Sequence, residues 1–548
     1  MPTPDSRCYF KSMTKFRLLF KQYRWAILSA LLLGSSYIPL PPWALFFCWV
    51  PIWRDVIEEK SLKRIFLKGW VLQVIAISIG FHWIAYTVAE FGNFSWIFAL
   101  AALCLYSTTV YLYFPLAMVA GVWLGRKTQM PLGWQFATIA SFHVVGEIFW
   151  PAIFPFNLGY PLYYVKMPIA QTADVIGVAG LSWLVYLLNA QIAWLSHRKE
   201  RVAARVLAFS LLGFLLLNLW GWQKKAQWEG GDRTLHILQV QANIGNFEKV
   251  QATKGYAFQS EILSQFFALT QEGLAQHPET ELVVWPETAF PDYLGAHNAG
   301  RPYTRQLIEF ARTIKRPILT GGFGNDPPDH FPRRQYNSLF LYDENGNAVA
   351  PYYFKTYLLI FGEYTPLGRQ FPALIKLNPA GEGWGWGSGP LVMSHRNLRF
   401  GPQICYEGVY PEFSRALARQ GAQIFVNATN DSWFGSPFEP MQHLMVTMAR
   451  AVENRRPLIR STNTGITSVA LADGTILQES PTHESWQGAF AVPYRENPEL
   501  TFYTKYGGLL PLVVGAFILL ACFAKRASKT KSLAGRIRVG KHRPPIRK

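Results

Sequence analysis

Three polar residues, each placed at the end of a β-rich run, have side chains that suit acyl transfer. Glu287 follows ELVVWP, Lys355 follows APYYF and Cys405 follows LRFGPQI. A cysteine thiolate is a strong nucleophile, a carboxylate can carry the thiol proton, and an ammonium can stabilise a developing oxyanion. The backbone N–H of Tyr406, directly after the cysteine, is a natural second oxyanion donor. Taken singly, these residues read as surface charges and a buried core cysteine, but together they form a coherent set for acyl transfer.

The elements that must position these residues lie between residues 232 and 500. Runs such as ELVVW and QIFVN lack two-residue alternation, which is typical of strands covered on both faces. The segment NSLFLYDENGNAVAPYYFK predicts a β-hairpin around a Gly-containing turn. Further strands are predicted at 235–241, 281–285, 316–322, 397–407, 421–429 and in pairs within 456–480, and helices at 254–276, 303–315, 412–420 and 440–453. Alternating strands and helices of this kind predict a layered α/β sandwich.

Outside this segment the chain is more apolar than a soluble domain. Half of the 548 residues are hydrophobic and only 16% are charged, against about 25% in a typical soluble domain. A helix that spans a bilayer needs about 20 apolar residues. Six runs meet this need, namely 69–89, 95–124, 131–150, 173–196, 203–222 and 507–524. The run 25–40 is slightly short, and Pro42–Trp53 is the weakest candidate because a helix of that length rises only about 18 Å.

The distribution of charge indicates how these runs cross a membrane. The formal net charge is +19, from 53 Lys and Arg against 34 Asp and Glu. Most of the excess lies in the segments 1–24, 54–68, 126–127, 198–205 and 525–548. The positive-inside rule places all of them in the cytoplasm if 25–53 crosses twice, around the bend at Pro39–Pro42. The positive charge is then a topology signal, and it does not indicate a nucleic-acid binder.

We therefore expect a polytopic α-helical membrane domain of about eight transmembrane helices and an extracytoplasmic α/β domain. The expected segments are a basic cytoplasmic N-terminus at 1–24, seven spans within 25–222, the α/β domain at 232–500, a C-terminal span at 507–524 and a basic cytoplasmic tail at 525–548. Of the five cysteines, only Cys405 lies in the α/β domain, so that domain cannot form an internal disulfide.

The order Glu287, Lys355, Cys405, with WPE, K-x8-E and CYE around them, resembles the nitrilase (carbon–nitrogen hydrolase) superfamily. That resemblance implies a nitrilase-like αββα sandwich and a Glu-Lys-Cys triad. Together with the predicted spans, the chain more closely resembles the apolipoprotein N-acyltransferase family. This similarity covers nearly the whole chain and is strongest in LFLYDENGNAVAPYYFKTYLLIFGEYTP, ICYEGVYPEF, NATNDSWFG and RSTNTGITS.

The family resemblance implies a role for each matching residue. Glu287 is the general base, Lys355 the oxyanion stabiliser and Cys405 the nucleophile. The implied supporting residues are Asn337 of YNS, Glu363 of FGEY, and Tyr406 and Glu407 after the cysteine. The carboxylates of Glu363 and Glu407 can be read either as catalytic groups or as structural ion-pair partners.

Two positions depart from the family pattern, and one loop has two readings. Ile360 stands where a Pro commonly precedes FGE. Val250 stands where a Trp linked to acceptor handling is common, so we expect substrate positioning to differ there. The Gly-rich segment 381–390 carries Trp384 and Trp386 and reads as a lipid-touching lid or as a surface turn with packed aromatics.

The resemblance implies an acyltransferase that works through a thioester in two ping-pong steps. The acyl donor is a membrane phospholipid, with phosphatidylethanolamine expected, and the acceptor is the α-amine of the S-diacylglyceryl-cysteine that begins a bacterial apolipoprotein. The implied location is the bacterial inner membrane with a periplasmic catalytic domain, and we expect a monomer. A nucleotide motif is not recognised, and His236, His277 and His443 lack ligand spacing, so neither a cofactor nor a metal is expected.

Two other functions are compatible with parts of the same sequence. A membrane-tethered amidase or nitrile hydrolase would use the same triad with water as the acceptor. A transporter or scaffold would use the sandwich only to bind peptides, and its function would not depend on Cys405.

Overall fold

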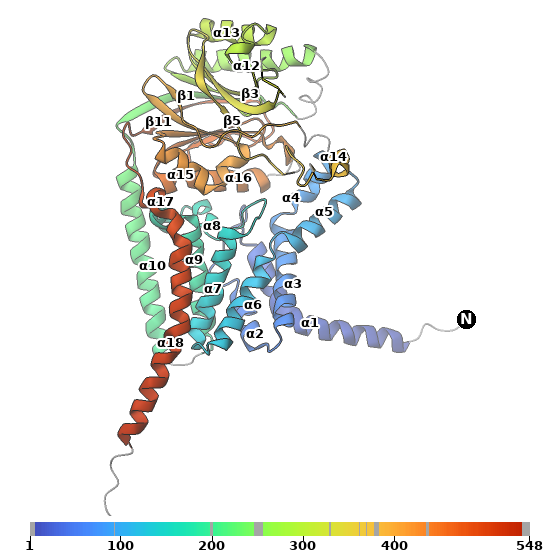
Figure 1. The fold of residues 1–548 in the computed structure, drawn as a ribbon, viewed down its shortest axis with the longest axis vertical. Coiled ribbons are helices and arrows are strands. Elements are labelled where there is room, and N and C mark those ends of the chain that lie inside the picture. Colours follow the sequence, from blue (N-terminus) through green and yellow to red (C-terminus); the bar gives the residue numbers. More distant parts are fainter. Residues whose placement is uncertain are drawn as a thin grey trace, which may run out of the picture.

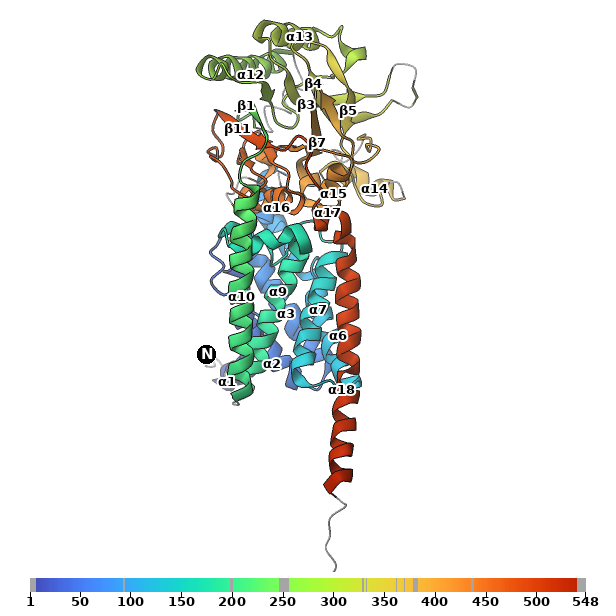
Figure 2. The same cartoon turned by 90° about the vertical axis from the view of Figure 1, so that its left-hand side faces the viewer.

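The computed structural model describes residues 6–91, 94–197, 201–245, 256–327, 330–331, 333–360, 362–368, 370–377, 383–434 and 438–539. Figure 1 shows two parts, one above the other. A helical part is built from both ends of the chain, and a sandwich of two sheets with helices is built from the middle. The two views in Figures 1 and 2 agree that the sandwich sits at one end of the helical part.

The first sheet has the strand order β11-β1-β2-β3-β4-β5. β1 pairs parallel with β2 and β2 with β3, and the remaining pairs are antiparallel. Its strands are β1 (Arg233–Gln241), β2 (Leu282–Val284), β3 (Ile318–Asn325), β4 (Gln335–Tyr342), β5 (Ala348–Phe354) and β11 (Trp486–Tyr494). β4 and β5 form the predicted hairpin around Gly346, which takes a positive φ of 77°.

The second sheet has the order β10-β9-β8-β7-β6, with a parallel centre formed by β7, β8 and β9. Its strands are β6 (Met393–His395), β7 (Leu398–Ile404), β8 (Ile424–Thr429), β9 (Leu458–Thr462) and β10 (Ser468–Ala470). β8 is buried throughout, as the apolar run QIFVN predicts for a strand covered on both faces.

Helices cover the outer faces of both sheets, which completes an αββα sandwich. α12 (Tyr256–Gln276) and α13 (Pro302–Ile314) pack on the first sheet through a core that includes Phe266 and Trp285. α15 (Pro411–Arg419) and α16 (Phe438–Asn454) share one core with the second sheet and the inner face of the first. The predicted layered fold is confirmed. β6 and β11 were not predicted; β11 pairs with β1 along nine residues.

The helical part contains one chain segment from each side of the sandwich. Its main helices are α1 (Ser6–Gly34), α2 (Val50–Glu58), α3 (Leu62–Gly80), α4 (Trp83–Tyr86), α5 (Trp96–Thr109), α6 (Tyr113–Lys127), α7 (Leu132–Phe149), α8 (Tyr160–Tyr164), α9 (Ala173–Leu195), α10 (Arg201–Trp228), α17 (Phe502–Tyr506) and α18 (Leu510–Val539). In both ribbon views α10 and α18 run along the outside of the other helices.

Four helical segments of the described chain are long and apolar enough to cross a membrane: Trp96–Lys127, Pro168–Leu195, Arg205–Trp228 and Phe502–Ala524. The predicted span 69–89 is bent, because Leu62–Gly80 and Trp83–Glu90 meet at 61°. Pro42–Trp53 does not form one helix, since turns occupy residues 43–49 and α2 begins at Val50. The count of eight spans stays a prediction.

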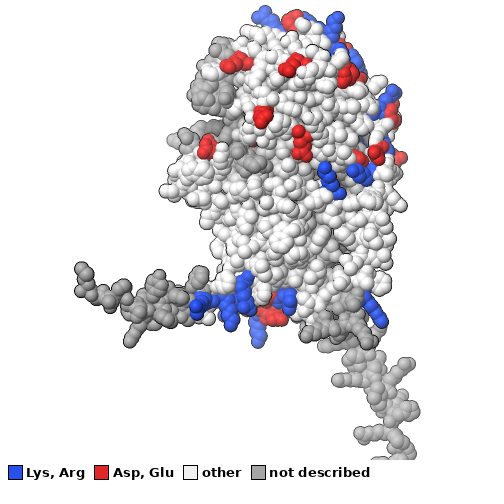
Figure 3. Space-filling model, turned by 180° about the vertical axis from the view of Figure 1, so that it is seen from behind, with Lys and Arg blue, Asp and Glu red and all other residues white. Residues whose placement is uncertain are grey.

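Charged residues mark the two ends of the helical part. Figure 3 shows Lys and Arg gathered at the end far from the sandwich, and a band of uncharged surface between them and the sandwich. Exposed cations of the first two predicted basic segments include Arg17, Lys21, Arg24, Arg54 and Lys63. An uncharged band of this kind suits the apolar interior of a bilayer.

α16 fixes the sandwich to the helical part through buried polar contacts. The Gln442 side chain donates to the carbonyls of Ile38 (2.7 Å) and Gly80 (2.9 Å) and accepts from the Trp83 indole (3.1 Å). Just after α16, the Arg455 guanidinium lies 2.9 Å from an Asp174 carboxylate oxygen at the start of α9. Because these polar groups are buried and paired, separating the two parts would leave them unsatisfied.

Candidate active site

Three strand ends and one loop bring two carboxylates to one buried lysine. Lys355 directly follows β5, and its Nζ lies 3.2 Å from Glu287 Oε1 and 2.8 Å from Glu363 Oε2. Asn337 on β4 donates from Nδ2 to Glu287 Oε1 at 2.6 Å and to Glu363 Oε1 at 2.9 Å. Both carboxylates are therefore bound to the same ammonium and the same amide. These shared contacts fix the orientation of the Glu287 and Glu363 carboxylates.

These carboxylates keep the buried Lys355 side chain protonated. The side chain is only 2% exposed. Burial lowers the pKa of Lys355, but Glu287 and Glu363 more than offset this, so its pKa lies above the ordinary value. A permanent ammonium at this point can stabilise negative charge on a substrate oxygen.

Cys405 begins a short turn at the end of β7. The turn is a 3-10 helix, Cys405–Val409, and Cys405 itself has a positive φ of 50°. Burial raises the pKa of the Cys405 thiol, Glu287 raises it further, and Lys355 opposes both effects. The resting thiol is therefore protonated at neutral pH. Among the carboxylates, Glu287 raises the pKa of this thiol most strongly.

The Glu407 carboxylate links the segment after Lys355 to the end of β7, just before Cys405. Its Oε1 accepts from the Tyr353 hydroxyl (2.6 Å) and the backbone N–H groups of Thr356 (2.5 Å) and Tyr357 (3.1 Å), and its Oε2 accepts from the Ile404 N–H (2.7 Å). Burial raises the pKa of Glu407 to about 7, and these hydrogen bonds oppose that rise. These contacts favour the structural reading of Glu407, although its partners are backbone groups and a tyrosine rather than the expected ion pair.

Tyr406 connects the turn Cys405–Val409 to the helical part. Its hydroxyl donates to the Ile153 carbonyl, in the loop between α7 and α8, and its ring packs edge-on against Phe154 and Tyr410. The turn that begins at Cys405 thus lies at the boundary between the sandwich and the helical part.

Comparisons with known proteins agree with this combination of parts. Residues 239–486 match the carbon–nitrogen hydrolase family model, and residues 29–191 match the model of the apolipoprotein N-acyltransferase N-terminal domain. An apolipoprotein N-acyltransferase of Bdellovibrio bacteriovorus is 46% identical over 510 residues, which is 90% of this chain and 93% of that protein. The chain belongs to the apolipoprotein N-acyltransferase family. It is therefore an acyltransferase that carries a carbon–nitrogen hydrolase domain.

More distant relatives show the same full-length match. The apolipoprotein N-acyltransferase of Geobacter metallireducens is 29% identical over 518 residues, 93% of this chain and 96% of that protein. Among solved structures, an amidase from Nesterenkonia sp. covers 48% of this chain and 92% of its own, with 20% identity and a TM-score of 0.34.

The structure brings together most of the site residues that the sequence predicts for this N-acyltransferase family member. Glu287, Lys355, Glu363 and Asn337 form one hydrogen-bonded cluster, and Cys405 lies close enough for Glu287 and Lys355 to shift its pKa. Their catalytic roles stay predictions. Val250 lies outside the described residues, as do residues 381–382 of the predicted lid.

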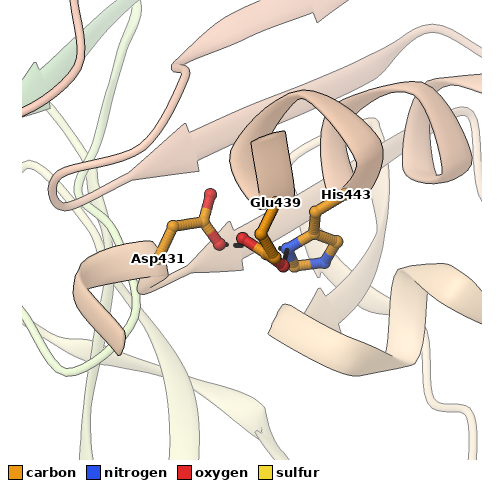
Figure 4. A group of neighbouring side chains, drawn as sticks. All are labelled: Asp431, Glu439 and His443. Atoms are coloured by element: carbon orange, nitrogen blue, oxygen red, sulfur yellow. Dashed lines mark hydrogen bonds and ion pairs between the residues drawn. The ribbon is translucent and has the colours of Figure 1, made fainter. Parts of the chain in front are cut away.

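A second polar cluster behind Cys405 was missed. Figure 4 shows Asp431, Glu439 and His443, and one possible ligand atom from each lies within 4.8 Å of the others. Arg460 on β9 contacts Asp431 and Asn427. The available signal was Arg460 itself, a charged residue inside the apolar strand run LIRST.

A cavity of about 510 Å³ lies beside the carboxylate cluster. Its walls include Arg334, Glu363, Tyr364, Trp384 and Trp386. The second half of the predicted lid is held by backbone hydrogen bonds, from the Gly385 N–H to the Gln335 carbonyl (2.7 Å) and from the Gly387 N–H to the Lys355 carbonyl (2.8 Å). The loop is thereby fixed at the mouth of the site, next to Lys355.

The protonated state of Cys405 can be tested through its alkylation. Because the pKa of the thiol is raised, less thiolate is present at pH 8 than in a free cysteine, whose pKa is about 8.5. We expect the rate of Cys405 alkylation by iodoacetamide, followed on its peptide by mass spectrometry, to keep rising beyond pH 9. A rate that is already constant between pH 6 and 8 would instead indicate a preformed thiolate.

The structural reading of Glu407 gives a prediction for stability. Glu407→Ala leaves the backbone N–H groups of Thr356, Tyr357 and Ile404 without their acceptor, and we expect the free energy of unfolding to fall by about 2–4 kcal/mol. Glu412→Ala, which removes an exposed carboxylate five residues away, is the matched control. Equal thermal midpoints for the two variants would show that Glu407 does not hold these loops together.

Proposed function

We propose that this protein transfers an acyl chain from a membrane phospholipid to the α-amine of the S-diacylglyceryl-cysteine of an apolipoprotein, through a thioester on Cys405. The observation that carries the proposal is the buried Lys355 ammonium, bound to Glu287 and Glu363 beside the Cys405 turn. Acyl transfer requires a base, a cation and a nucleophile in one buried site.

In the first step, Cys405 attacks the carbonyl carbon of the sn-1 ester of the donor, with phosphatidylethanolamine as the expected lipid. Glu287 takes the thiol proton as the C–S bond forms. The oxyanion lies against the Lys355 ammonium and the Tyr406 N–H. When the C–O bond breaks, Glu287 returns the proton to the glycerol oxygen, and lysophospholipid leaves.

In the second step, the acceptor amine attacks the carbonyl carbon of the thioester. Glu287 now takes a proton from the amine, and the same cation stabilises the second oxyanion. The C–S bond breaks, the thiolate of Cys405 takes the proton back from Glu287, and the N-acylated lipoprotein leaves. One carboxylate thus serves both steps, since it ends each step in its starting protonation state.

The place of the site in the molecule supports lipid substrates. The Tyr406 hydroxyl contacts the loop after α7, so the nucleophile lies next to the helical part. Exposed apolar side chains line the cavity, among them Leu367 (60%) and Trp386 (45%). We propose that these side chains meet the bilayer surface, with eight spans, cytoplasmic termini and the sandwich in the periplasm of the inner membrane. The basic far end in Figure 3 supports this orientation.

The proposed function is tested by product analysis. Purified protein is incubated with phosphatidylethanolamine that carries an isotopically labelled sn-1 chain and with a synthetic diacylated lipopeptide. We expect labelled N-acyl lipopeptide and lysophospholipid in equal amounts, and no product from Cys405→Ala. An N-terminally acetylated lipopeptide is the matched control, because it lacks the attacking amine.

The other two functions correspond to different products. Labelled free fatty acid without labelled lipopeptide would assign the protein to the membrane-tethered hydrolases. Absence of both products from folded wild-type protein would favour a binding or scaffold role. Either result would overturn the proposed transferase function.

A further inference from the structure

A chain of buried hydrogen bonds leads from the Cys405 backbone to Asp431. Asn427 on β8 donates from Nδ2 to the Cys405 carbonyl oxygen at 3.1 Å. Arg460, its neighbour on β9, donates to Asn427 Oδ1 and to Asp431 Oδ2, both at 2.8 Å. The His443 Nδ1 lies 3.0 Å from the other oxygen of Asp431. Asn427 and Arg460 are fully buried, so these contacts are not shared with solvent.

The charges of Asp431 and Arg460 in this cluster are paired with each other. Burial opposes ionisation of Asp431, but Arg460 and His443 hold its pKa below the ordinary value. Burial and the neighbouring Asp431 raise the pKa of Glu439, and burial and Arg460 lower that of His443. Asp431 and Arg460 form a buried ion pair, with Arg460 donating to Asp431 Oδ2 at 2.8 Å. One carboxylate oxygen of the group in Figure 4 is therefore already bound by Arg460.

The backbone conformation of Cys405 indicates a role for the hydrogen bonds that link it to Asn427, Arg460 and Asp431. A positive φ is unfavourable for a non-glycine residue, and such a backbone persists only where its surroundings hold it. The φ of Cys405 is 50°, and its carbonyl is the group that Asn427 binds. If this carbonyl turned, the thiol and the following N–H of Tyr406 would turn with it.

We propose that Asn427, held in place by Arg460 and Asp431, is a positioning residue for acyl transfer: its amide fixes the strained turn that aims the Cys405 thiol at the acyl donor. The inference rests on Cys405 being the nucleophile of the proposed function. Asn427 acts through the backbone of Cys405 and takes no part in proton transfer.

The test is Asn427→Asp, which keeps the size of the side chain and its contact with Arg460 but replaces the amide donor by an oxygen. Misplacement of a reacting atom by about 1 Å can cost about 100-fold in rate. We expect the rate of Cys405 acylation by phosphatidylethanolamine to fall about 100-fold, with the donor KM and the final acylated fraction unchanged. A purely structural role would lower the acylated fraction instead, because part of the protein would be unfolded.

Asn454→Asp is the matched control. Asn454 is also buried, donates from Nδ2 to a backbone carbonyl (Arg450, 3.1 Å) and accepts at Oδ1 (from Thr504, 2.9 Å), but it contacts neither Cys405 nor Arg460 in the described structure. If wild type and Asn454→Asp acylate Cys405 while Asn427→Asp does so at the same rate, the positioning role is wrong. If wild type forms no thioester, the proposed function itself fails.

Discussion

Lys355→Met should slow acylation of Cys405 by at least about 10³-fold. The substitution keeps the length of the side chain but removes the only cation bound to Glu287 and Glu363 in the described site. The oxyanion then loses its charged donor, and removal of a single donor of this kind costs about 10²–10³-fold in other acyl-transfer enzymes. Two buried carboxylates that share Asn337 without a cation add a further electrostatic cost to each anionic intermediate. The measurement is single-turnover formation of the thioester.

A charge-compensated variant separates this loss from unfolding. Lys355→Met alone leaves two buried carboxylates unpaired and should lower the thermal midpoint. Lys355→Met combined with Glu363→Gln removes one charge of each sign, and we expect it to recover most of that midpoint without recovering the acylation rate. Recovery of the rate together with stability would mean that Lys355 only supports the fold.

Glu287→Gln should lower the acylation rate by about 10²–10⁴-fold, the usual contribution of a general base. The amide can still accept from Asn337 and Lys355, so the packing of the site is kept. Because the pKa of the Cys405 thiol is raised, the variant has little thiolate at neutral pH. Its rate should therefore rise with pH as hydroxide replaces the missing base, whereas the wild-type rate should level off. The pH profile of thioester formation measures this.

Glu363→Gln is the control that the structure itself offers. Glu363 binds the same Asn337 amide and the same Lys355 ammonium as Glu287. Its Oε2 also accepts from the Leu359 N–H at 2.8 Å, which ties it to its own loop. We expect about a tenfold loss for Glu363→Gln, because it orients the lysine. Equal losses for both variants, with the same pH dependence, would contradict the assignment of Glu287 as the base.

The sequence predicts the sandwich well because its strands carry strong local signals. The β4–β5 hairpin is predictable from its Gly-containing turn. β8 is predictable because its residues form a continuous apolar run, which is typical of a strand covered on both faces. β11 was missed because Trp486–Tyr494 is only partly buried and lies at the edge of the sheet beside β1. Its partner is about 250 residues away in sequence, and local patterns do not report such pairing.

The membrane part and the second polar cluster were harder to predict for different reasons. Hydropathy averages over a window, so it reports apolar character at 69–89 but not the 61° bend within Leu62–Glu90. His443 lies twelve positions after Asp431 in the sequence, and Arg460 lies seventeen positions after His443. Only the parallel pairing of β8 with β9 and the packing of α16 bring them to the Cys405 backbone.

Glu407 shows how one motif can hold residues of two kinds. In CYE, Cys405 lies close enough to Glu287 and Lys355 for both to shift its pKa, whereas Glu407 accepts four hydrogen bonds from the chain around it. A motif identifies residues that occur together, but the contacts decide which of them can touch a substrate. Glu407 is occupied by its partners, and the Lys355 ammonium faces the carboxylates beside the cavity.

The central claim is that the acyl chain passes through Cys405, and the mass of the Cys405 peptide tests it most directly. Wild-type protein is incubated with donor phospholipid carrying a labelled sn-1 chain, without acceptor, and is then digested. We expect the Cys405 peptide to gain the mass of the labelled chain, neutral hydroxylamine to remove this chain, and added lipopeptide to take it up on its amine. Full formation of labelled lipopeptide by wild type and Cys405→Ser alike, with an unlabelled Cys405 peptide throughout, would contradict it.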